Sequence, residues 1–154
     1  MRPEEIKPDT ALCTILGYNA QTGYARKYFN KWLKQNHINA TAIALNITDE
    51  HFDFTMSSVG QSKVDKMILE PEFKEKVKEY CSRVEGGSLE SIDFVEIIDT
   101  KVVGYALDSS VDRLFENPAF IDERMRLVAK MMLIAKRWYG VEVSLDAIPL
   151  LIEK

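Results

Sequence analysis

The sequence predicts an α/β fold, a three-layer sandwich whose mostly parallel sheet has one antiparallel strand. Short apolar runs alternate along the chain with segments whose apolar residues recur at helical spacing. The segments between the first three runs are long enough for the helical crossovers that parallel strands require. Two later runs are joined only by Asp99 and Thr100, which is hairpin spacing, so one of them runs antiparallel to its neighbour.

The first half of the chain is expected to hold three strand–helix units. The predicted strands are Ala11–Tyr18, Asn39–Ile47 and Val64–Leu69. The first predicted helix is Tyr24–Lys34. The second is short, is capped by Thr48, and carries Phe52, Met56 and Val59 on one side. The third starts at Pro71 and has one apolar stripe, formed by Phe73, Val77, Tyr80 and Cys81.

The second half is expected to form a hairpin followed by helices. After a loop at Gly86–Ser88, the predicted strands are Ile92–Ile98 and Lys101–Leu107. A short helix capped by Ser109–Ser110 through Phe115, a long helix from Pro118 to Tyr139 and a last helix capped by Ser144 complete the chain. Apolar residues cover more than one face of the long helix, which predicts that it is largely buried and ends at Gly140.

Length and composition exclude several classes of protein. A chain of 154 residues with 46% hydrophobic and 29% charged residues suits one folded domain, over residues 1–154. A net charge of −4 argues against a nucleic-acid partner. No apolar run could span a bilayer, and residues Met1–Ile6 form no apolar leader. We therefore expect a cytoplasmic protein without a membrane partner, in which Cys13 and Cys81 are reduced thiols.

Cofactor and metal motifs are missing from the sequence. No glycine-rich turn of the G-x-G-x-x-G or G-x-x-x-x-G-K-S/T type links a strand to a helix, so no dinucleotide cofactor is expected. His37 and His51 have no metal-ligand spacing to each other or to a cysteine, so no metal is expected.

Four segments, taken in order, resemble shikimate dehydrogenases. The family's first loop and helix align with Gly17–Asn30 (GYNAQTGYARKYFN), and the segment that carries its catalytic lysine aligns with Phe73–Val77 (FKEKV). Its hairpin, which ends in an aspartate, aligns with Ser91–Asp108 (SIDFVEIIDTKVVGYALD). Its closing helix aligns with Arg126–Ile148 (RLVAKMMLIAKRWYGVEVSLDAI). The residues matched are Gly17, Asn30, Lys74, Gly104, Asp108, Trp138 and Gly140.

This resemblance implies a substrate-binding domain without its cofactor domain. In the family a Rossmann domain separates the aspartate strand from the closing helix. Here only Ser109–Asn117 lies between Asp108 and Pro118. The implied fold is therefore that of the family's N-terminal domain, which is like that of amino-acid dehydrogenases, joined directly to the closing helix.

The resemblance also implies a catalytic pair, Lys74 and Asp108. In the family this pair handles the proton of the hydroxyl that is oxidised, and a lysine with a carboxylate suits general acid–base chemistry. The alternative is that both are solvated surface charges, or an ion pair left from ancestry. The sequence leaves both interpretations open.

Other binding positions of the family are substituted. The paired serines that bind the substrate carboxylate are Gly23 and Ala25 here, and the histidine before them is Thr22. These losses argue against shikimate itself as the ligand.

Charged residues stand at three further positions of the family's site. Two neutral amides are replaced by Asp93 and Lys130, and a proline by Arg26. Lys74, Lys130 and Arg26 could hold an anion, with Asp93 and Asp108 taking hydroxyls or a cation. Alternatively, the cleft has lost its ligand and Lys130 simply pairs with Asp93.

We expect this chain to bind a small polar or anionic molecule, or to have lost its ligand. We do not expect it to be a dehydrogenase on its own. One alternative is an enzyme that uses Lys74 and Asp108 for dehydration or isomerisation of a hydroxylated acid. Another is a dehydrogenase whose cofactor domain is a separate subunit. A homodimer could also cover the surface that a missing domain leaves.

Overall fold

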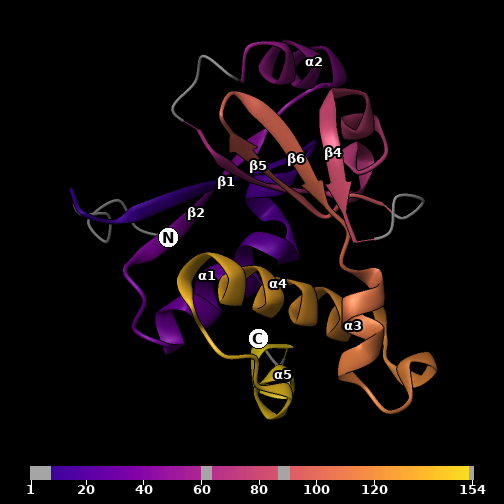
Figure 1. Ribbon diagram of the computed structural model, residues 1–154. Helices are drawn as coiled ribbons and strands as arrows, with labels where there is room; N and C mark the ends of the chain where they lie inside the picture. Colours follow the sequence, from indigo (N-terminus) through magenta and orange to yellow (C-terminus); the bar gives the residue numbers. More distant parts are fainter. Residues whose placement is uncertain (1–7, 60–63, 87–90, 153–154) are drawn as a thin grey trace.

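The computed structural model describes residues 8–59, 64–86 and 91–152, which form one mixed sheet covered by helices on both faces (Figure 1). Six strands lie in the order β2-β1-β3-β5-β6-β4. They are β1 (Ala11–Gly17), β2 (Ala40–Asn46), β3 (Lys66–Leu69), β4 (Cys81–Glu85), β5 (Phe94–Ile98) and β6 (Lys101–Tyr105). Only β5 runs antiparallel to its neighbours, β3 and β6, which confirms the predicted fold class.

The described residues also form five α-helices and several 3₁₀ turns, some between the strands and some after the last strand. The helices are α1 (Tyr24–Gln35), α2 (Asp49–Ser57), α3 (Asp108–Leu114), α4 (Glu123–Tyr139) and α5 (Ile148–Ile152). The turns are η2 (Ala20–Thr22), η4 (Pro71–Phe73), η5 (Lys76–Tyr80), η6 (Pro118–Phe120) and η7 (Leu145–Ala147). No helix of the part that the structure describes is long and apolar enough to cross a membrane.

The sheet separates two apolar cores. Helix α2 lies on one face, while α1, α4 and α5 lie on the other (Figure 1). Successive residues of β1 enter opposite cores, because strand side chains alternate between faces. Ile15 packs with α1 and α4, whereas Leu16 packs with Phe52 of α2 and Phe73 of η4.

Local capping sets the ends of α4. The side chain of Asp122 accepts a hydrogen bond from the Met125 N–H at 2.8 Å, which starts the helix. Gly140 ends it in the left-handed conformation, at a φ of 72°. The predicted stop at Gly140 is thus confirmed, but the helix begins at Glu123 because Pro118–Phe120 forms a separate 3₁₀ turn and Ile121 is extended.

The segment after Pro71 differs from the prediction. Instead of one helix it forms the turns η4 and η5, and Cys81 then begins the strand β4. β4 pairs in parallel with β6 at the edge of the sheet, and its side chains are mostly exposed. Such an edge strand lacks the apolar alternation that marks a strand in a sequence, so the sequence indicated five strands instead of six.

A smaller difference concerns the start of α3. α3 begins at Asp108, so the predicted caps Ser109 and Ser110 lie inside the helix. Residues Met1–Ile6, and Gly87 and Ser88 of the predicted loop, lie outside the described residues.

Candidate functional site

The candidate site lies at the edge where β1, β3 and β6 end and β5 begins. Asp93 immediately precedes β5, and its backbone is held on both sides. Its N–H donates to the Tyr105 carbonyl at 2.8 Å, and its carbonyl accepts from the Leu69 N–H at 3.1 Å. Ligands of open α/β sheets bind at the carboxyl ends of the parallel strands, and this edge is such a place.

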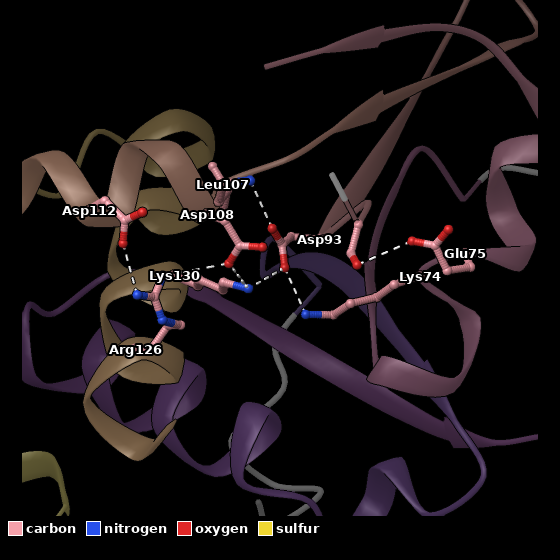
Figure 2. A network of polar contacts seen from close by, with 9 residues as sticks. Lys74, Glu75, Asp93, Leu107, Asp108, Asp112, Arg126 and Lys130 are labelled. Atoms are coloured by element: carbon pink, nitrogen blue, oxygen red, sulfur yellow. Dashed lines mark hydrogen bonds and ion pairs between the residues drawn. The ribbon is translucent and has the colours of Figure 1, made fainter. Parts of the chain in front are cut away.

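The Asp93 carboxylate is the centre of a buried ion network (Figure 2). Only 2% of the residue is exposed. Its Oδ1 accepts from Lys74 Nζ at 2.7 Å and from Lys130 Nζ at 2.8 Å, and its Oδ2 accepts from the Leu107 N–H at 2.7 Å. Both oxygens are therefore hydrogen-bonded, as a buried carboxylate requires.

The network continues from Lys130 towards solvent. Lys130 Nζ lies 2.9 Å from Asp108 Oδ1, and Arg126 lies 3.6 Å from the same oxygen. Arg126 also pairs with Asp112 at 2.8 Å. Figure 2 shows these contacts as one chain from Lys74 to Asp112, in which cations and carboxylates alternate and their formal charges cancel.

Electrostatics keeps the middle of this network ionised. Burial alone would raise the pKa of Asp108, but the hydrogen bond and charge of Lys130, with Arg126 and Lys74, outweigh it and lower that pKa. Burial alone would lower the pKa of Lys130, but Asp93 and Asp108 outweigh it and raise that pKa. Lys130 and Asp108 therefore both carry their charge at neutral pH.

A cleft of about 280 Å³ opens beside the network. The residues that line it include Tyr24 and Ala25 of α1 and Arg126 and Lys130 of α4. Glu70, Lys74 and Asp93 also line it. Leu69 also lines the cleft, whereas Met67 packs in the core beside α2.

Helix α4 is anchored to the sheet by a second polar cluster. The Glu96 carboxylate of β5 accepts hydrogen bonds from Arg137, Trp138 and Tyr105 at 2.7 to 3.0 Å. Because Arg137 and Trp138 are at the carboxyl end of α4, these bonds hold the helix that carries Lys130 and Arg126 against the sheet.

The predicted site residues fall into two groups. Lys74, Asp93 and Lys130 meet at the cleft, and Asp108 joins Lys74 through Asp93 and Lys130.

The other three predicted residues are engaged elsewhere. Thr22 donates to the Asn19 carbonyl at 3.3 Å, and Arg26 donates to the Gln21 carbonyl at 2.8 Å. Gly23 is the residue before α1 and lies against the side chain of Glu70.

Sequence reasoning missed several residues of the cleft, among them Arg126 and Glu70. Arg126 precedes Lys130 by one helical turn, and that spacing could have placed both on one face of α4. Glu70 directly follows β3, and its place after a predicted parallel strand was the signal available.

Comparison with known proteins identifies the fold. Neither a protein-family model nor a curated protein sequence matches this chain. Among solved structures, shikimate dehydrogenase from Aquifex aeolicus matches 84% of this chain with a TM-score of 0.62 and 18% identity. Shikimate 5-dehydrogenase from Listeria monocytogenes, solved with shikimate and NAD, matches 76% with a TM-score of 0.62 and 12% identity. The 5-ketofructose reductase of a Gluconobacter strain matches 82% with a TM-score of 0.60 and 9% identity.

These matches show a shikimate-dehydrogenase-like fold. The alignments cover 54% of the Aquifex chain, 41% of the Listeria chain and 51% of the Gluconobacter chain, so this chain spans about half the length of the proteins it matches. At such low identity the likeness concerns the fold and carries no activity with it.

Proposed function

We propose that this chain is a relative of the shikimate dehydrogenase substrate domain and binds a small, hydroxylated anion in the cleft beside Asp93. The observation that carries the proposal is the ammonium group of Lys74. Lys74 lines the cleft, its side chain is 16% exposed, and its ammonium group donates a hydrogen bond to Asp93. An ammonium has three N–H donors, so Lys74 can also bind a carboxylate or a hydroxyl.

The charges around the cleft favour a negative ligand. The cations Lys74, Arg124, Arg126 and Lys130 line it together with three carboxyl groups, Glu70, Asp93 and Glu123. Burial and the charge of Glu72 raise the pKa of Glu70. Asp93 is already bound to two lysines, so the remaining donors of the cleft point to an anion.

Proton transfer by Lys74 and Asp108 is less well supported than binding. A general acid or base works best with a pKa near the working pH. The lowered pKa of Asp108 moves away from neutrality, and Lys130, which bridges Asp108 to the cleft, has a raised pKa. Groups that stay charged throughout this range suit electrostatic binding.

Hydride transfer by this chain alone is also disfavoured. The sequence has no glycine-rich phosphate turn, and the connection 109–117 between Asp108 and Pro118 is too short to contain a nucleotide-binding domain. We therefore assign no dehydrogenase activity to the isolated chain.

Calorimetric titration of the purified chain with malate, tartrate, quinate and shikimate tests the proposal. We expect at least one hydroxylated acid to bind, and Lys74→Met to weaken that binding about tenfold or more, because a charge-assisted hydrogen bond is lost. Lys78→Met is the matched control, since Lys78 pairs with Glu75 outside the cleft.

Two results would contradict the proposal. Failure of every acid in the panel to bind the unmodified chain would remove the binding function. NADP-dependent oxidation of shikimate or quinate by the purified chain, followed by NADPH absorbance, would show that the domain is a dehydrogenase.

A further inference from the structure

Arg124 is a cation of the cleft whose charge is not paired with a carboxylate of the described residues. It lies in the first turn of α4 and is exposed. The other three cations that line the cleft form ion pairs, Lys74 and Lys130 with Asp93, and Arg126 with Asp112. Glu123, which precedes Arg124 and also lines the cleft, forms no ion pair with it. The charge of Arg124 is therefore available to a ligand.

Tyr24 of α1 holds the side chain of Arg124 in place. The two residues are 100 positions apart, and Arg124 Nη2 donates a hydrogen bond to the Tyr24 hydroxyl at 2.8 Å. The central carbon of the guanidinium lies 4.6 Å from the centre of the Tyr24 ring, which is a cation–π contact. The Tyr24 ring in turn stacks on the buried ring of Tyr28, with centroids 5.5 Å apart. A long, exposed side chain is thus restrained before a ligand binds, which lowers the entropy lost on binding.

This arrangement leaves donors of Arg124 for a ligand. A guanidinium has five N–H donors in one plane, and the bond to Tyr24 takes one of them. A cation–π contact engages the face of the guanidinium and leaves the N–H groups at its edge. Such an edge binds a carboxylate through two parallel hydrogen bonds, a geometry that an ammonium group cannot offer.

We propose that Arg124 binds the carboxylate of the ligand and that Tyr24 positions it for this. The inference rests on the proposed function and adds the group that distinguishes an acid from a neutral molecule of the same shape. Asp93 already compensates the charges of Lys74 and Lys130, so Arg124 is the cation of the cleft that gains most from an added carboxylate. The remaining donors of Lys74 are then left for a hydroxyl of the same ligand.

Acids and their amides test this assignment. Malate, tartrate, quinate and shikimate are each compared with the corresponding amide, in which a neutral carboxamide replaces every carboxylate. Isothermal titration calorimetry measures the acids, and displacement of a bound acid extends the measurement to weakly bound amides. For the unmodified chain we expect at least one acid to bind about tenfold or more tightly than its amide, because charge-assisted hydrogen bonds are made only by the acid.

Three variants isolate Arg124. Arg124→Met removes the guanidinium, and we expect it to weaken binding of the acid about tenfold while the amide binds as before. Arg124→Lys keeps the charge without the planar fork, so it should restore only part of this loss. Lys27→Met is the matched control, since Lys27 Nζ lies 5.6 Å from the same Tyr24 ring but does not line the cleft. We expect it to change the affinity for the acid by no more than about twofold, because exposed charges outside the site are screened.

Tyr24→Phe tests the positioning role. This variant removes the hydroxyl that accepts from Arg124 and keeps the ring. We expect it to weaken binding of the acid about threefold in the unmodified chain and to add no further loss to Arg124→Met, because residues that act through one contact are not additive. Additive losses would show that Tyr24 acts independently of Arg124 and would remove it from the assignment.

The outcomes separate this inference from the function on which it rests. If an acid binds and Arg124→Met keeps its preference over the amide, Arg124 does not bind the carboxylate, and the proposed binding function still stands. If Arg124→Met weakens the acid and the amide alike, or if Lys27→Met costs as much, the inference fails in the same way. If none of the four acids binds the unmodified chain, the inference and the binding function fail together.

Discussion

Lys130 Nζ lies 2.8 Å from Asp93 Oδ1, although the two residues are 37 positions apart in the sequence. The side chain of Lys130 is 9% exposed and that of Asp93 is 2% exposed, so this is a buried ion pair. Removing one member of such a pair leaves an uncompensated charge in the interior. The pair therefore ties the start of β5 to α4 and makes this part of the cleft lining sensitive to single substitutions.

Asp93→Asn should be strongly destabilising. The substitution leaves two ammonium groups, those of Lys74 and Lys130, without their shared carboxylate. We expect the free energy of unfolding in urea to fall by about 3–5 kcal/mol. Asp112→Asn is the control, because Asp112 is 50% exposed and its pair with Arg126 should contribute no more than about 1 kcal/mol. Equal, small effects of the two substitutions would show that Asp93 is not the structural centre of the network.

Asp93 and Lys130 should also be energetically coupled. In a double-mutant cycle with Asp93→Asn and Lys130→Met, we expect the double variant to be more stable than the sum of the single effects predicts, by about 1–3 kcal/mol. The exposed pair of Lys136 and Glu142, 3.8 Å apart, provides the comparison, and its coupling should stay below about 0.5 kcal/mol. Urea unfolding of all variants measures both values, and additive effects at Asp93 and Lys130 would argue against a direct interaction.

The sequence predicted the part of the fold that local signals determine. The antiparallel β5 follows from a connection of two residues, Asp99 and Thr100, which permits only a hairpin. The edge strand β4 could not be predicted, because the spacing of Phe73 and Val77 fits a helix and continues into Cys81. Pairing with β6, a contact distant in sequence, decides the conformation there.

The candidate site was predictable only through family resemblance. A single aspartate or lysine has no local signal, so Asp93 and Lys130 were found by their places in an aligned frame. That both lysines bind one oxygen of Asp93 depends on how α4 packs on the sheet. Glu70 lies outside the aligned segments, and only the structure shows that its side chain lines the cleft and packs against Gly23.

Asp108 should stabilise the fold above acidic pH. Its pKa in the folded chain is lower than its ordinary value of 3.8, so the unfolded chain binds the proton more tightly. The stabilisation that Asp108 provides is therefore complete above pH 3.8, and it is lost as the pH falls through the lower pKa of the folded chain. We expect the stability difference between the unmodified chain and Asp108→Asn to be constant above about pH 5 and to shrink below pH 4. Urea unfolding across this range measures it, and a difference that grows on acidification would reverse the assignment.

Glu70 should have the opposite pH dependence. Burial and the charge of Glu72 raise its pKa above the ordinary value of 4.5, so the folded chain binds the proton more tightly than the unfolded chain does. Ionisation of Glu70 therefore lowers the stability of the fold as the pH rises from 4.5 through the raised pKa of the folded chain. The full loss of stability is reached above that raised pKa. We expect Glu70→Gln to be more stable than the unmodified chain at pH 7.5, with a gain that disappears below pH 4.5.

Thermal unfolding at the two pH values measures this gain, and Glu79→Gln, which removes an exposed charge, should show none. A gain that is independent of pH would mean that the folded chain does not raise the pKa of Glu70.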